Sequence, residues 1–333
     1  MPRFRLVLCL CCLCLVSVFG LGAAQSVTTA RDVLARAQQL ADDARVRYRD
    51  SDSFSIDQEL WREAIAVGER GLELDPNDPD ILRFLAETHT SIDWHIRAWD
   101  YWLRYLNAGG SLDREARAQL AGVGAELGYA RYQAGDLAGA LGYYERLYDL
   151  NPDDTDALRW IGRIYFERGE PATALPYWRE AAARDAEGAD YYLRRTEQQI
   201  AVGVNASDTF HQGIAAYHAG ELEAALGHFE RATRYNDSFA EAFAWTGRVN
   251  LELSRPAAAV SAWQQVVALT PSDDGARYFL DVAEAQCDWG VDAATAFYDG
   301  LSRYNEGRIA EASERFAEAA QANLQLYDIV SSA

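Results

Sequence analysis

Apolar residues recur at helical spacing along nearly the whole chain from Thr28 onward. This period is typical of helices with one buried face, whereas the alternation and β-branched enrichment of a strand are not found. Turn signals such as NPDD at 151–154 and RGEP at 168–171 separate segments of about a dozen residues. The pattern therefore predicts an all-α protein built from short helices.

One unit of this pattern, residues 155–187, is especially clear. Its first helix carries Gly162 and its second carries Ala174, both small enough for a close helix crossing, while Trp178 fills the space beside them. The combination resembles the tetratricopeptide repeat, a helix pair of about 34 residues. Four further copies fit the same frame: residues 121–154, 206–239, 240–273 and 293–326.

The resemblance implies an α-solenoid, or superhelix, in which each helix pair packs mainly on its neighbours. Two poorer copies precede the clear ones, with a first helix within 30–49 that a polar insert separates from its second helix. We therefore divide the chain into a signal peptide, degenerate repeats, a repeat pair, an additional helix with a repeat pair, and an additional helix with one repeat and a capping segment. The five ranges are 1–24, 25–110, 111–187, 188–273 and 274–333.

The copies are unevenly spaced. The pairs that start at 121 and at 206 are 85 residues apart, which is more than two repeats require. An additional helix accounts for the excess and occurs twice, as YYLRRTEQQIAVGV at 191–204 and YFLDVAEAQCDWGV at 278–291. We interpret the duplicated unit as one helix followed by two repeats.

The first 24 residues are typical of a secretory signal peptide, because Arg3 and Arg5 precede an apolar run that ends in small residues at Ala24. An uncleaved membrane anchor is the alternative. Cleavage leaves Cys287 as the single cysteine, which excludes an intramolecular disulfide and which we expect to be packed in its helix. These features predict an extracytoplasmic bacterial protein, in the periplasm or cell envelope or secreted, with no membrane segment in the mature chain.

The composition limits the partners. The chain has 31 basic and 51 acidic residues and a formal net charge of −20. Such a charge disfavours nucleic acid and anionic lipid as general partners.

No motif for catalysis is recognisable in the sequence. His211 and His218 lie seven residues apart on one predicted helix, but no cysteine and no HExxH pattern accompanies them. Nucleophile elbows and glycine-rich phosphate loops are also missing. We therefore predict no enzyme activity, no metal site and no cofactor.

In tetratricopeptide proteins the inner groove is lined by set positions of each first helix. The resemblance implies that these positions bind a protein or peptide partner, with rings covering apolar area and arginines pairing with acidic groups. The alternative is that these side chains contact the next repeat or the additional helix. The residues at these positions are Tyr129, Tyr132, Arg159, Arg163, Phe166, Phe210, Tyr217, His218, Arg248, Phe297 and Tyr304.

The aromatic run WHIRAWDYW at 94–102 is the next candidate for a contact surface. Its rings at 94, 99, 101 and 102 cannot all share one helix face, so we expect at least one to be exposed or to contact another element.

The sequence thus predicts a non-catalytic, protein-binding or peptide-binding scaffold of the bacterial cell envelope. The alternative is an accessory or glycan-binding component of a cell-wall-processing system, since sugars stack on exposed rings. Oligomeric state and the identity of the partner are left open.

Overall fold

A computed structural model of the chain describes residues 29–323. The predicted signal peptide at 1–24 and the predicted capping segment at 324–330 lie outside this range.

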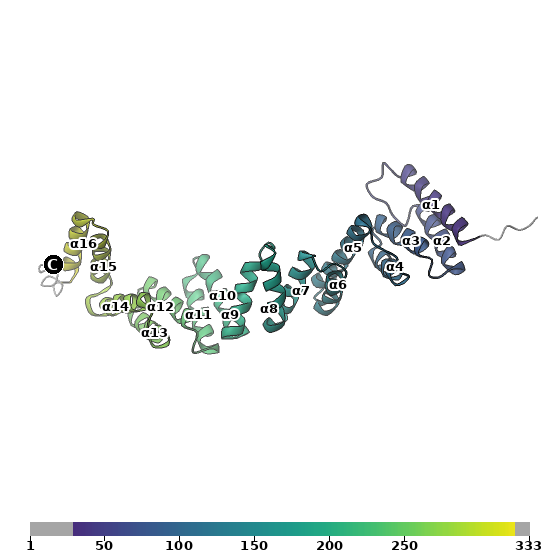
Figure 1. Ribbon diagram of the computed structural model, residues 1–333. Helices are drawn as coiled ribbons and strands as arrows, with labels where there is room; N and C mark the ends of the chain where they lie inside the picture. The colour runs from purple at the N-terminus through teal and green to yellow at the C-terminus, as the bar shows by residue number, and fades with distance from the viewer. Residues whose placement is uncertain (1–28, 324–333) are drawn as a thin grey trace, which may run out of the picture. The chain divides into compact units, whose positions relative to one another are not determined.

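Within the described range the chain is entirely helical, which confirms the all-α class. The helices pack in sequential pairs of the tetratricopeptide-like solenoid type (Figure 1). Their bounds are α1 (Ala30–Arg47), α2 (Glu59–Leu74), α3 (Pro79–Ser91), α4 (His95–Asn107), α5 (Arg114–Gln133), α6 (Leu137–Leu150), α7 (Thr155–Glu167), α8 (Pro171–Ala183), α9 (Ala189–Val202), α10 (Val204–His218), α11 (Leu222–Tyr235), α12 (Ala240–Glu252), α13 (Pro256–Leu269), α14 (Asp274–Trp289), α15 (Val291–Asn305) and α16 (Ile309–Ala322).

The chain divides into two compact units, with the boundary between Val123 and Gly124 in α5. Unit 1 holds α1 to α4, and its core includes the fully buried rings of Trp61 and Trp102. Helix α1 pairs with α2 across the polar insert, as the sequence predicts. In the aromatic run, Trp94 is 40% exposed, which agrees with the expected exposed ring.

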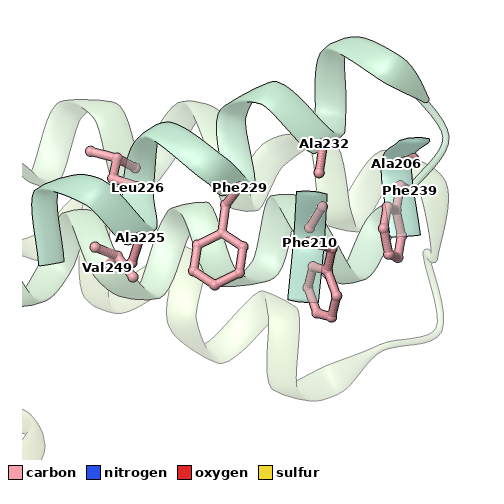
Figure 2. Close-up of a cluster of buried hydrophobic side chains, with 9 residues drawn as sticks. Ala206, Phe210, Ala225, Leu226, Phe229, Ala232, Phe239 and Val249 are labelled. Atoms are coloured by element: carbon pink, nitrogen blue, oxygen red, sulfur yellow. The ribbon is translucent and has the colours of Figure 1, made fainter. Parts of the chain in front are cut away.

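Unit 2 holds the clear repeats, and its crossings depend on small residues beneath rings. A Cβ atom added at Gly162 would lie 2.9 Å from the Trp178 ring, and one added at Gly213 would lie 2.6 Å from the Phe229 ring. Figure 2 shows the core around Phe229, where Phe210 packs at 5.6 Å between ring centroids. The predicted repeat frame therefore places the crossing glycines correctly.

The additional helices α9 and α14 behave as first helices of a further repeat. The starts of α7 and α9, Thr155 and Ala189, are 34 residues apart. On α9, Tyr192 stacks on Trp178 of the preceding helix at 4.6 Å, just as Trp160 on α7 stacks on Tyr144 at 5.2 Å. Helix α14 repeats this contact through Phe279 and Trp263, at 4.9 Å.

Neither α9 nor α14 is followed by the second helix that would complete its repeat. Instead, Gly203 alone joins α9 to α10, which we name the first junction, and Gly290 alone joins α14 to α15, which we name the second junction. Gly203 has φ 92° and ψ 148°, and Gly290 has φ 90° and ψ 154°. This backbone region is essentially restricted to glycine, so the chain turns without a loop. The repeating module is therefore two and a half repeats, or five helices.

An asparagine holds each junction. The side chain of Asn236 donates to the carbonyl oxygen of Val202, and that of Asn323 donates to the carbonyl oxygen of Trp289, both at 2.9 Å. Each bond satisfies the last carbonyl before the junction glycine, which the helix itself leaves without a partner.

One expectation about packing is wrong. Cys287 on α14 is exposed rather than packed. It lies beside Asp288, which is also exposed, so this face of α14 is turned to solvent.

Candidate functional site

Two clusters of the same four residue types lie on the first helices of unit 2. Each contains a tyrosine, a tryptophan, an arginine and a glutamate, and corresponding members are 85 residues apart. The first cluster is Tyr132, Trp160, Arg163 and Glu167, and the second cluster is Tyr217, Trp245, Arg248 and Glu252. In each, the tyrosine belongs to one repeat and the other three residues belong to the next. The clusters therefore form only when neighbouring repeats pack.

In the first cluster the Tyr132 hydroxyl donates to Glu167 Oε1 at 2.6 Å. Its ring lies 5.0 Å from the Trp160 ring in an edge arrangement. The Arg163 guanidinium lies 5.2 Å from the Tyr132 ring centre, and Arg163 Nε donates to Glu167 at 2.9 Å. Burial and then the bond to Glu167 raise the pKa of Tyr132, so the hydroxyl stays protonated and remains a donor.

The second cluster repeats this geometry with one difference. The Tyr217 hydroxyl donates to Glu252 Oε1 at 2.7 Å, and its ring lies 4.9 Å from Trp245. The bond to Glu252 and then burial raise the pKa of Tyr217. Arg248 lies 4.9 Å from the Trp245 ring centre, but within residues 29–323 it forms no ion pair. Its exposed guanidinium is therefore open to a partner in a way that Arg163 is not.

The two neighbouring arginines of α7 are already paired within their own helix. Arg159 Nη1 lies 3.1 Å from Asp156 Oδ1, and Arg163 Nε lies 2.9 Å from Glu167 Oε1. The carboxylates compensate the two like charges, so an acidic partner has to compete with them.

Three of the predicted groove rings pack inward to different degrees. Phe166 is 8% exposed and Phe210 is 2% exposed, so both belong to the core. Phe297 is half-buried and packs on Phe316 at 5.6 Å between ring centroids. Phe166 contacts Tyr192 of the additional helix α9, and Phe297 contacts Trp289 of the additional helix α14, as the alternative expects. Phe210 instead packs on Phe229 of its own repeat.

Three other predicted residues present exposed side chains. Tyr129 is 43% exposed and packs beside Trp160 at 5.6 Å, so it extends the first cluster. His218 is exposed beside Tyr217 and extends the second cluster. Tyr304 is 56% exposed at the corresponding position of the last repeat.

The predicted groove omitted the tryptophan and the glutamate of each cluster. Trp160 and Trp245 hold the tyrosine rings, and Glu167 and Glu252 accept from their hydroxyls. A signal was present in the sequence, because these residues keep the 85-residue offset of the tyrosines and arginines.

The first junction carries a third group of polar residues that the sequence prediction did not single out. Arg195 of α9 donates through Nη2 to Asp208 Oδ1 of α10 at 2.9 Å, and Gln199 Nε2 donates to the same oxygen at 2.9 Å. The guanidinium of Arg195 also lies 5.0 Å from the Phe166 ring centre. Within the described chain the buried Arg195 Nε and Gln199 Oε1 have no hydrogen-bond partner.

His211 of α10 belongs to the same junction. Its Nε2 lies 3.0 Å from Gln198 Oε1, an acceptor, so the neutral ring donates from Nε2. Burial, followed by the charge of Arg195, lowers the pKa of His211 to about 4. At neutral pH the imidazole is therefore uncharged and acts only as a hydrogen-bonding group.

Between residues 29 and 323, no cluster of three or more histidine, cysteine, aspartate or glutamate side chains is arranged to hold a metal ion. No helix in that part of the chain is long and apolar enough to cross a membrane.

Two segments of the chain match a known family model. Residues 126–194 and 210–276 match the family model described as tetratricopeptide repeat. The chain is 26% identical over 216 residues to cellulose synthase 2 operon protein C of Komagataeibacter xylinus, covering 64% of this chain and 16% of that protein. A CTR9 homolog of Arabidopsis thaliana is 26% identical over 114 residues, or 32% of this chain and 10% of that protein. The chain thus spans about a sixth or less of these curated relatives.

Among solved structures, a tetratricopeptide repeat protein from Parabacteroides merdae is 10% identical, with a TM-score of 0.30, over 91% of this chain and 97% of that one. YrrB, described as a tetratricopeptide protein with an unusual peptide-binding site, is 16% identical, with a TM-score of 0.26, over 75% of this chain and 91% of that one.

The two matched segments cover helices α6 to α8 and α11 to α13 entirely, together with the start of α9 and most of α10. All residues of the first cluster lie in the first matched segment, and all residues of the second cluster lie in the second. The match to the tetratricopeptide repeat model is therefore confined to residues 126–194 and 210–276, and it agrees with the helix pairs of the fold.

Proposed function

We propose that the chain is a non-catalytic scaffold that binds a protein or peptide segment along the first helices of unit 2. The observation that carries the proposal is the duplicated tyrosine, tryptophan, arginine and glutamate cluster. Aromatic rings and arginine anchor interfaces because they cover a large area and form directional bonds at low entropic cost. Both clusters keep the same hydrogen bond and ring contact in two separate modules.

Exposed side chains beside each cluster support this face as the binding surface. Tyr129 extends the first cluster, His218 extends the second, and Arg248 within the second cluster is itself exposed. Because Arg159 and Arg163 are paired internally, we propose that Arg248 is the stronger contact for an acidic group of the partner.

Photo-crosslinking tests the surface. A photoreactive residue placed at Tyr129 or His218 in the full chain should give a specific crosslinked species, while one placed at Arg231 on α11, a second helix, should not. The variant Arg248→Glu should weaken partner binding by about 2 kcal/mol and reduce its salt dependence. The matched control is Arg231→Glu, which changes the charge equally at an exposed arginine on a second helix.

Equal loss of crosslinks in both charge-reversed variants would contradict the proposal, because it would mean that net charge matters and the surface does not. Crosslinks from Arg231 but not from Tyr129 or His218 would place the contact on the second helices.

We also propose that the protein acts outside the cytoplasm of a bacterium, on the basis of the apolar run before Ala24. N-terminal sequencing of the mature protein should begin at Gln25. An intact Met1 on protein recovered from the cytoplasmic fraction would contradict it.

Glycan binding is the second candidate function, and the exposed rings of Tyr129 and Tyr191, at 43% and 48%, favour it. A similar protein of Komagataeibacter xylinus is named for a cellulose synthase operon. Co-sedimentation with insoluble cell wall, lost in Tyr129→Ala with Tyr191→Ala, would support this function over protein binding.

A further inference from the structure

A pocket of about 840 Å³ opens at the first junction, between the end of α7 and helices α9 and α10. It begins at Glu167 of the first cluster and reaches Ile214, three residues before Tyr217 of the second cluster. The pocket therefore shares one residue with the first cluster and ends about one helical turn from the second.

The lining has two kinds of surface. Phe166, Tyr192 and Ile214 are buried or half-buried and supply apolar contact. Glu167 and Asp208 also line the pocket, with side chains 34% and 44% exposed. Among residues 29–323, the donors to these two carboxylates reach only Oε1 of Glu167 and Oδ1 of Asp208, so the second oxygen of each can accept from a ligand.

The charges around the pocket are matched before any ligand enters. Arg195 pairs with Asp208, and Arg163 pairs with Glu167, each at 2.9 Å. A ligand that brings a full charge would disturb these pairs, whereas an uncharged hydrogen-bond donor would not. The Arg195 guanidinium already lies over the Phe166 ring. A second cation beside the guanidinium is therefore disfavoured, while a further aromatic ring can stack on the guanidinium.

The second junction shows that this polar lining is not required to join the modules. At the positions of Arg195, Asp208 and His211 it has Val282, Thr295 and Tyr298. Tyr298 is half-buried and contacts Tyr278 at 5.5 Å between ring centroids. The joint is therefore equally possible with apolar side chains, and the polar set at the first junction serves another purpose.

We propose that the pocket at the first junction receives an aromatic side chain with a hydrogen-bond donor, a tyrosine or a tryptophan, from the segment bound along the first helices. Such a side chain has an apolar ring for Phe166, Tyr192 and Ile214, and one donor for the free oxygen of Asp208 or Glu167. The inference rests on the proposed function and adds the identity of one anchoring residue in the partner.

Side-chain analogues test the pocket without any partner. Indole and p-cresol, titrated into the full chain with labelled isoleucine methyl groups, should shift the Ile214 signal saturably and leave Ile81 of unit 1 unchanged. Propylguanidinium and glucose serve as analogues of a basic side chain and of a saccharide, and each should need at least a fivefold higher concentration.

The second junction supplies the matched variants. His211→Tyr introduces the residue type that Tyr298 provides at the equivalent position of the second junction, and it should weaken indole and p-cresol binding at least tenfold. Tyr298→His makes the reverse change at the second junction and should leave the Ile214 response unaltered. If His211→Tyr fails to fold, Arg195→Val with Asp208→Thr removes the polar lining instead, and should weaken binding at least fivefold.

The proposal is overturned if neither analogue shifts Ile214 saturably, or if His211→Tyr binds both as tightly as the native chain. Stronger binding of propylguanidinium or glucose than of indole would assign the pocket to a basic side chain or a saccharide. These outcomes are independent of the crosslinking results, so the pocket can fail while the scaffold function holds, and the reverse.

Discussion

The two junctions of unit 2 are built on the same backbone plan with different side chains. Both use one glycine with φ near 90° and one asparagine that donates to the last carbonyl of the helix before that glycine. The first junction then adds Arg195, Asp208 and His211, which the second replaces with apolar or weakly polar residues. What the junctions share defines the joint between modules, and what differs defines a local property of the first one.

The largest effect should come from the shared glycines. Gly203→Val and Gly290→Val force a β-branched residue into a region that only glycine occupies, so each should lower the free energy of unfolding by about 3 kcal/mol. Chemical denaturation of the two variants checks this. Similar losses are expected at both sites, and a tolerant Gly290 would mean that the second junction bends differently.

The next effect separates the junctions. Asp208→Thr leaves the Arg195 guanidinium buried without its carboxylate, and should cost about 2 to 3 kcal/mol. Arg195→Val with Asp208→Thr copies the second junction and should restore stability to within about 1 kcal/mol of the native chain. A double-mutant cycle from denaturation curves measures the coupling. Additive losses would show that the pair does not act as a unit.

The pH response should also differ. The pKa of His211 is lowered from 6.5 to about 4, so between these values the unfolded chain binds a proton that the folded chain does not. The contribution of His211 to the free energy of unfolding is therefore fully present above pH 6.5. It is lost as the pH drops toward 4, by about 2 kcal/mol once partial exposure is allowed for. An imidazole titration followed by NMR should give a midpoint near 4. His211→Tyr should remove this contribution, and a midpoint near 6.5 would contradict the burial of the ring.

The smallest effect should come from the asparagines. Asn236→Ala removes the donor to the Val202 carbonyl and should cost about 1 kcal/mol. Hydrogen exchange of the amides at the start of α10 reports the local loosening. Asn236→Asp is the matched control, because it keeps the size of the side chain and replaces the donor with an acceptor, so it should cost at least as much.

Much of the fold is predictable from the sequence because steric requirements recur at fixed spacing. Gly162 has to be small beneath Trp178, and Gly213 beneath Phe229, so the repeat frame can be read directly. The additional helices were also predicted, at 191–204 and 278–291. Their role was not, because the relation of Ala189 to Thr155 becomes apparent only when Tyr192 is seen to stack on Trp178.

The candidate site was less predictable. The tyrosines and arginines of the two clusters follow from groove positions, but Phe166 and Phe210 at similar positions are buried in the core. The pocket depends on side chains from α7, α9 and α10, and its location follows from the missing second helix after α9. No pattern within one repeat contains that information.

The duplication of the cluster has a consequence for binding strength. A partner with two copies of one recognition segment can occupy both clusters, and its second contact forms at the effective concentration set by the linker between the copies. Two weak contacts then act as one strong one, and the gain vanishes for a linker too short to reach. Avidity would make the chain selective for repetitive partners even where each single contact is unselective.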